Sequence, residues 1–137
     1  MKNENCVFAP GLKVFKGQDP EIDSYSALFD NASLNATELP RILEEVGATQ
    51  VFMCGLAYDV CVCSSCLDGL QIGYPVALVD NCCSAVDTGA IDEVRRKIDK
   101  LGGVVLQADK VKDFVCGEKR SIIMALKRAK KSCETKR

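Results

Sequence analysis

Residues 51–62, VFMCGLAYDVCV, decide the fold expected for this chain. The first residues are β-branched, aromatic or apolar and predict a buried strand. Gly55 and the residues that follow it predict a sharp turn, and Cys61 then stands where a helix is expected to begin. At a helix N-terminus the dipole favours thiolate over thiol, and unpaired backbone N–H groups can accept an oxyanion. The segment therefore predicts a strand–turn–helix elbow with Cys61 as its candidate nucleophile.

Apolar runs and helical patterns alternate on both sides of this elbow. Strands are expected at 12–15, 49–54, 75–79 and 104–106, and helices at 37–46, 61–72, 88–101, 108–115 and 118–131. Pro40 falls in the first turn of its helix, where proline is tolerated, and Gly73 is a helix stop. Strands joined by helices favour parallel βαβ units, so the predicted fold class is α/β, a parallel sheet with flanking helices in one domain.

The composition argues against several classes of partner. The 137 residues are 47% hydrophobic, enough for an ordinary core, and their formal net charge of −1 argues against a nucleic-acid partner. No apolar run approaches the ~20 residues that a membrane span needs, and residues 1–11 lack the apolar region of a signal peptide. A cytoplasmic protein without a membrane partner is therefore expected, with the basic residues at 127–131 as a solvated helix end.

The chain has nine cysteines and no histidine. Without an oxidising compartment we expect no disulfides, and we expect most cysteines to be small buried apolar side chains. Cys61, Cys63 and Cys66 cluster, but the second CxxC pair of a zinc ribbon is missing, so no structural zinc is expected. The missing histidine removes any imidazole base or metal ligand. A thiol-based redox or metal-binding protein is kept as a separate hypothesis.

Two segments together resemble the isochorismatase-like cysteine hydrolases, and within them the animal nicotinamidases. They are KGQDPEIDSYS at 16–26 and the elbow CGLAYDVCV at 54–62, and GYPVALVDNCC at 73–83 agrees with them. The match runs from about residue 14 to 110 and resembles the C-terminal half of such an enzyme. It implies an isochorismatase-like hydrolase fold without its N-terminal strands. Residues 1–11 would then be irregular, 12–116 the matching core, and 117–137 a C-terminal helix with a basic tail.

The resemblance implies an amidohydrolase that converts nicotinamide and water to nicotinate and ammonia in NAD salvage. Cys61 would form a thioester with the substrate. Lys16 is implied as the second catalytic residue, a fixed positive charge that favours developing negative charge. The backbone N–H groups of Ala57 and Cys61 would form the oxyanion hole, and the Leu56–Ala57 peptide would be cis. Taken alone, Cys61 also fits a structural cysteine and Lys16 a solvated charge.

Three further side chains, Tyr25, Leu56 and Val60, are implied to line a pocket for the flat pyridine amide. An aromatic ring at Tyr25 could stack on such a substrate. The residues by themselves leave an alternative open, because a loop tyrosine can also cover the core.

Four aspartates are weaker candidates. Asp59 is expected to accept backbone N–H groups of its turn, and Asp19 and Asp23 to cap turns. Asp80 follows an expected strand and could lie near the cleft, as strand-end residues do in α/β folds. None of the four is an evident general base for Cys61.

Two features of the family are missing from this chain: the catalytic aspartate and the ligands for zinc or another divalent metal. Neither has a counterpart in this sequence, which holds no histidine. We therefore expect the chain to be inactive alone. The strand at 49–54 would present an open edge, so the chain is expected to be marginally stable or to pair with a second copy or a full-length subunit. The alternative function is a non-catalytic truncated isoform or fragment that acts as an interaction partner.

Overall fold

The computed structural model describes residues 11–116, so the helix expected at 118–131 and the basic residues at 127–131 lie outside the described residues. The elements are α1 (Leu39–Glu45), β1 (Val51–Leu56), the π-helical turn η1 (Tyr58–Val62), α2 (Cys63–Gln71), β2 (Val76–Ser84), the 3-10 turn η2 (Thr88–Ala90), α3 (Ile91–Lys100), β3 (Val104–Leu106) and α4 (Ala108–Cys116).

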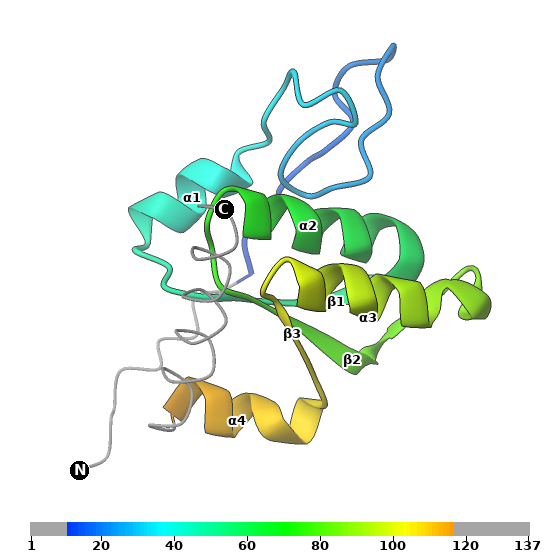
Figure 1. The fold of residues 1–137 in the computed structure, drawn as a ribbon. Helices are drawn as coiled ribbons and strands as arrows, with labels where there is room; N and C mark the ends of the chain where they lie inside the picture. Colours follow the sequence, from blue (N-terminus) through cyan, green and yellow to red (C-terminus); the bar gives the residue numbers. More distant parts are fainter. Residues whose placement is uncertain (1–10, 117–137) are drawn as a thin grey trace, which may run out of the picture.

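The sheet is parallel, with the strand order β1-β2-β3. Helices α2 and α3 cover one face of the sheet and α4 covers the other (Figure 1). The predicted α/β class is confirmed. β1 pairs only with β2 within the described sheet, which places it at an edge, as the sequence predicted.

The core has two layers because β2 is buried on both of its faces. Val76 and Leu78 pack towards α2 and α3, in a cluster that includes Cys66 and Ile98. On the opposite face, Ala77 and Val79 pack with Val104 and Leu106 of β3 and with Val111 and Phe114 of α4. A central parallel strand therefore reads as a continuous apolar run, VALV at 76–79.

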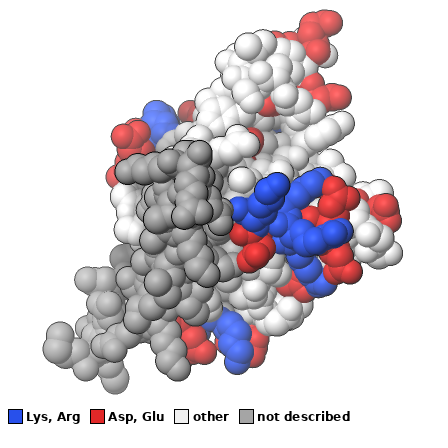
Figure 2. Space-filling view, viewed as in Figure 1, with Lys and Arg blue, Asp and Glu red and all other residues white. Residues whose placement is uncertain are grey.

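The outer face of α3 is charged (Figure 2), and blue and red side chains alternate there without a single-sign patch. Asp92 and Glu93 lie in its first turn and Lys97 and Lys100 in its last, which complements the helix dipole. The Lys97 ammonium lies 2.7 Å from the Glu93 carboxylate, one turn away. This face is therefore a solvated surface, as the amphipathic pattern predicts.

The prediction of a strand at 12–15 is wrong. These residues form no strand, and Leu12 and Phe15 are 69% and 70% exposed. A strand forms only where a neighbour satisfies its backbone groups, and the described sheet offers none to this segment. β2 is longer than the predicted 75–79. Its first part pairs with both β1 and β3, and after a register shift its last residues, Cys83 and Ser84, pair with β1 again.

The expectation that most cysteines are buried is also wrong for the seven that the structure describes. Cys63 and Cys66 are buried and Cys61 and Cys83 half-buried, whereas Cys54, Cys82 and Cys116 are exposed. All seven are free thiols. Over residues 11–116, no helix combines the length and apolar character that crossing a membrane requires.

Candidate active site

The elbow forms at the carboxyl end of β1, where the chain enters η1 and then α2. Gly55 has a φ of 123°, a conformation that favours glycine, and the Leu56–Ala57 peptide is cis, as the resemblance implied. The helical segment starts at Tyr58 rather than at Cys61. Cys61 consequently lies in the first turn, half-buried, instead of opening the helix.

Lys16 and Cys61 lie together although 45 residues separate them in the chain. The Lys16 Nζ is 3.3 Å from the Cys61 Sγ. The same ammonium group donates a hydrogen bond to the backbone oxygen of Tyr25. The Lys16 ammonium therefore places a positive charge directly beside the Cys61 sulfur.

Buried contacts fix the loop that carries Tyr25 onto α2. The Ala27 N–H donates to the Ser65 Oγ at 2.8 Å, and the Ser65 hydroxyl donates to the Cys61 carbonyl at 2.7 Å. The next residue, Leu28, is completely buried, and its carbonyl accepts from the Thr37 N–H at 2.9 Å. The loop is thus anchored at 27–28, next to the segment that carries Cys61.

Asp59 ties the nucleophile turn to the segment that follows β2. Its carboxylate accepts from the backbone N–H groups of Val86 and Asp87, each at 2.9 Å. These hydrogen bonds, from Asp87 and from Val86, hold the pKa of Asp59 below its usual range. The predicted backbone bonding of Asp59 is confirmed, but the donors come from a distant segment rather than from its own turn. Asp19 caps a turn as predicted, accepting from the Glu21 N–H at 2.9 Å.

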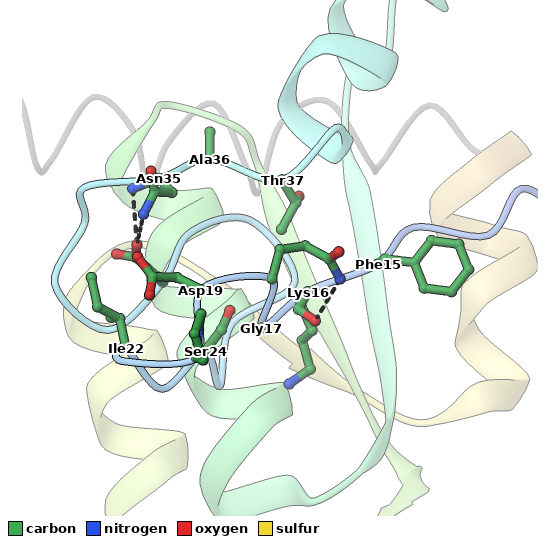
Figure 3. Close-up of a pocket in the computed structure, with 12 residues that line it drawn as sticks. Phe15, Lys16, Gly17, Asp19, Ile22, Ser24, Asn35, Ala36 and Thr37 are labelled. Atoms are coloured by element: carbon green, nitrogen blue, oxygen red, sulfur yellow. Dashed lines mark hydrogen bonds between the residues drawn. The ribbon is translucent and has the colours of Figure 1, made fainter.

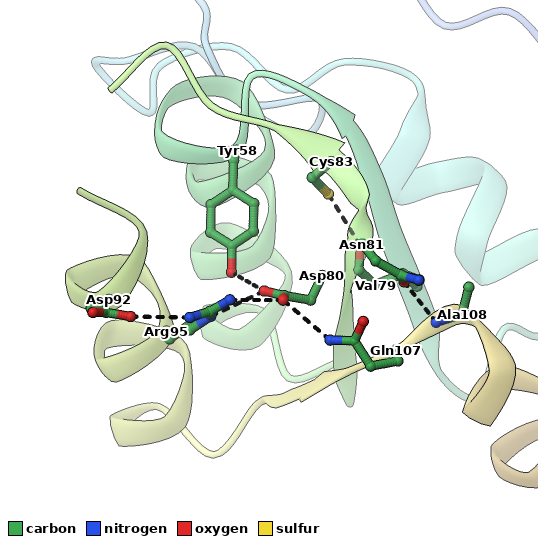
Figure 4. A network of polar contacts seen from close by, with 9 residues as sticks. All are labelled: Tyr58, Val79, Asp80, Asn81, Cys83, Asp92, Arg95, Gln107 and Ala108. Carbon is green, nitrogen blue, oxygen red and sulfur yellow. Dashed lines mark hydrogen bonds and ion pairs between the residues drawn. The ribbon is translucent and has the colours of Figure 1, made fainter. Parts of the chain in front are cut away.

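A second anchor, missed in the sequence, is a polar network around Asp80 (Figure 4). The buried Tyr58 donates its hydroxyl to Asp80 at 2.7 Å, and Arg95 of α3 donates to both carboxylate oxygens, at 3.1 and 2.8 Å. Gln107 adds a bond of 3.2 Å. The Arg95 hydrogen bonds hold the pKa of Asp80 below its usual range, while burial, followed by the bond to Asp80, raises the pKa of Tyr58.

Asp80 was expected near the cleft, but this network gives it a structural role instead. Its side chain is 13% exposed, and the partners above occupy both of its oxygens. The sequence signals were Asp80 after an expected strand and a tyrosine in the elbow, since a buried tyrosine hydroxyl needs a partner. Nothing in the sequence pairs Tyr58 with an arginine 37 positions later, because only packing of α3 brings Arg95 there.

The three residues predicted to line a pyridine pocket differ in exposure, and the pocket itself stays a prediction. The Tyr25 residue is 44% exposed, Leu56 is 74% exposed, and Val60 is half-buried. A cavity of about 460 Å3 does open within the loop, with Lys16 at its edge (Figure 3). Its walls come from residues 15–37, and neither Cys61 nor any of the three predicted residues lines it. It is therefore distinct from the predicted pocket.

The described residues do not fit a metal ion. In the range 11–116, no group of three or more His, Cys, Asp or Glu side chains is placed to hold one. Burial raises the pKa of the Cys63 thiol and raises that of Cys66 to about 12, so both stay protonated at neutral pH.

Comparison with known proteins finds relatives among the nicotinamidases. Nicotinamidase from Escherichia coli K12 is 40% identical over 72 residues, which are 53% of this chain and 34% of that protein. The structure of PnC1 from L. infantum in complex with nicotinate is 34% identical, with a TM-score of 0.62, and covers 64% of this chain and 44% of that one. Pyrazinamidase of Pyrococcus horikoshii in complex with zinc is 25% identical, with a TM-score of 0.57, covering 65% and 46% of the two chains.

These shares mean that the chain spans about a third of the length of the curated relatives it matches. The family model of the isochorismatase domain matches residues 3–110, which include Lys16, the elbow and all three strands. By this match the chain belongs to the isochorismatase family.

Proposed function

We propose that the site serves a nicotinamidase-type amidohydrolase of NAD salvage, with Cys61 as nucleophile and Lys16 as its charged partner. The observation that carries the proposal is the 3.3 Å separation between the Lys16 Nζ and the Cys61 Sγ at the carboxyl end of β1. The nicotinamidases among the similar proteins support nicotinamide as the substrate class.

The reaction forms and then breaks one bond to sulfur. The Cys61 thiolate attacks the amide carbon, and the carbonyl oxygen becomes an oxyanion that the backbone N–H groups of Ala57 and Cys61 would stabilise. The carbon–nitrogen bond then breaks and ammonia leaves, taking up a proton, which produces a thioester. Water attacks the thioester carbon, the carbon–sulfur bond breaks, and nicotinate leaves; the Cys61 thiolate is restored and the two protons of the water pass to solvent. Lys16 supplies fixed positive charge beside the sulfur throughout.

The proton transfers lack an evident carrier in the described part of the chain. Among the hydrogen bonds of residues 11–116, none joins a carboxylate to the Cys61 thiol. Asp59, in the elbow, and Asp80, which accepts from Tyr58, are occupied by other donors. Loss of one member of a catalytic triad commonly costs several orders of magnitude in rate. We therefore expect the chain alone to bind substrate near Cys61 and to turn it over slowly or not at all.

Two measurements on the purified 137-residue chain test the proposal. The first is ammonia release from nicotinamide, compared with the Cys61→Ala variant. The second is the rate at which iodoacetamide alkylates Cys61, resolved by mass spectrometry, with and without millimolar nicotinamide. The exposed Cys82 is the internal control. Nicotinamide should protect Cys61 and leave Cys82 unchanged. The absence of both protection and Cys61-dependent release would refute the proposal.

A second function, as a non-catalytic interaction partner, is favoured by the place of β1. This strand has a neighbour on one side only in the described sheet, and Cys54 in its middle is exposed. An open edge of this kind can accept a strand from another chain.

Sedimentation velocity at micromolar concentrations tests this second function. Because a charge on an edge strand blocks pairing, Cys54→Lys should shift the chain from dimer towards monomer. The matched control is Cys116→Lys, which places the same charge at an exposed position of α4. Monomeric wild-type protein at all concentrations, or an equal shift in both variants, would exclude pairing through β1.

A further inference from the structure

Ser65 connects the two segments that supply the reactive pair. We infer that the Ser65 hydroxyl is a positioning group, which holds the Lys16 ammonium against the Cys61 thiol by joining the loop to the nucleophile turn. This role rests on the proposed function of Cys61 and Lys16.

The contacts form a closed ring. From Lys16, one bond reaches the Cys61 sulfur and another reaches the carbonyl of Tyr25. Two residues after Tyr25, the Ala27 N–H donates to the Ser65 Oγ, and the Ser65 hydroxyl returns to the Cys61 carbonyl. The ring therefore begins at the side chain of Cys61 and ends at its backbone.

Of the two hydrogen bonds that Ser65 makes, the one to Cys61 is common in helices and the one from Ala27 is not. A serine in a helix often donates to the carbonyl four residues before it, as Ser65 does to Cys61. The bond from Ala27 comes from a residue 38 positions away, and it uses the lone pair that the helix leaves free. Ser65 is only 6% exposed, so water does not readily replace either partner.

Hydrogen bonds from the Tyr25 N–H to Asn31 Oδ1, at 3.0 Å, and from the Thr37 hydroxyl to the Ala27 carbonyl, at 2.6 Å, fix the shape of the loop itself but do not join it to α2. The Lys16 residue is exposed, as are Gly17 and Gln18 after it. Burial of Leu28 anchors the loop, but apolar packing is not directional. The hydrogen bond to the Ser65 hydroxyl, in contrast, fixes the position and orientation of the Ala27 backbone relative to α2. Two residues earlier in the same backbone, the Tyr25 carbonyl accepts from the Lys16 ammonium, so it is positioned as well.

The first experiment measures alkylation of Cys61 by iodoacetamide at neutral pH, site by site, in the 137-residue chain. Ser65→Ala should slow this reaction about threefold to tenfold, because the ammonium moves away from the sulfur and its Coulomb attraction falls. Ser64→Ala, at the half-buried neighbouring serine, is the matched control and should stay within about twofold of wild type. Protection of the buried Cys63 and Cys66 in the same spectra shows that each variant is folded.

A coupling measurement separates positioning from a purely structural role. Lys16→Met should slow Cys61 alkylation by a clearly larger factor in wild type than in the Ser65→Ala background, since the ammonium is already displaced there. Equal factors in the two backgrounds, or equal rates for Ser65→Ala and Ser64→Ala, would overturn the inference. If Ser65→Ala fails to fold, the same comparison uses Ser65→Thr and Ser65→Val, which have one shape with and without the hydroxyl; equal rates for these two would also overturn it.

These readouts need no turnover. A chain that releases no ammonia, or that nicotinamide does not protect, would count against the proposed function and would leave the Ser65 measurement intact. Slower alkylation of Ser65→Ala together with unequal Lys16→Met factors would support the positioning role in either case.

Discussion

Leu28→Ala removes the apolar anchor of the loop that brings Lys16 to Cys61. Leu28 is fully buried and lies at α2, where its Cδ1 would be 3.7 Å from a Cβ added to Gly69. Truncation of a buried leucine to alanine costs about 2–5 kcal/mol, depending on how far the site collapses. The loop can move towards the space that the side chain leaves, so we expect the lower end, about 2–3 kcal/mol, in the free energy of unfolding. Alkylation of Cys61 should slow in parallel, because Lys16 loses its support.

Urea unfolding followed by far-UV circular dichroism measures this loss, and Leu34→Ala is the matched control. Leu34 lies in the same loop but is 74% exposed, so its truncation should change the free energy of unfolding by no more than about 0.5 kcal/mol. If the two variants unfold within about 0.5 kcal/mol of each other, the loop is not part of the cooperative core and the anchoring argument is wrong.

Three further predictions concern packing, pH and assembly. Gly103→Ala should destabilise the chain by about 1–3 kcal/mol, because its Cβ would lie 2.6 Å from the Ile98 Cγ2, whereas Gly11→Ala, with open space around it, should be neutral in the same urea titration. The pKa of Asp80 is held low by Arg95, so its contribution is present above about pH 4 and is lost as the pH falls through the lowered value. The stability difference between wild type and Asp80→Asn should therefore shrink between pH 7 and pH 3, and a constant difference would contradict the assignment. The open edge of β1 predicts weak or concentration-dependent thermal unfolding, and a cooperative, concentration-independent transition of a monomer would contradict it.

Local sequence patterns were sufficient to predict the elements whose type depends mainly on their own residues. The apolar run at 51–56, the glycine at 55 and the residues at 57–66 predicted a strand, a turn and a helix, and the structure contains all three. Gly73, with a φ of 99°, ends α2 where the sequence predicted, because an L side chain rarely adopts that conformation. The α/β class follows from the alternation of such elements.

The tertiary structure decided what depends on a neighbour. Residues 12–15 have the composition of a strand but no strand beside them in the described sheet, and Leu12 and Phe15 remain exposed. β2 runs on to Ser84 because, after a register shift, Gly55 and Leu56 of β1 pair with its last residues. Backbone pairing depends on two segments, so the sequence of one segment does not determine whether it pairs or where the pairing ends.

The site divides in the same way. The sequence predicted Cys61 as the candidate nucleophile through its elbow, and the family resemblance implied Lys16, 45 positions earlier, as its charged partner. Only the folded chain set their atoms 3.3 Å apart, recruited Ser65 between them, and buried Tyr58 against Asp80 and Arg95. Patterns of residues record which side chains the chemistry needs, whereas distances between them arise from packing of segments that are remote in sequence.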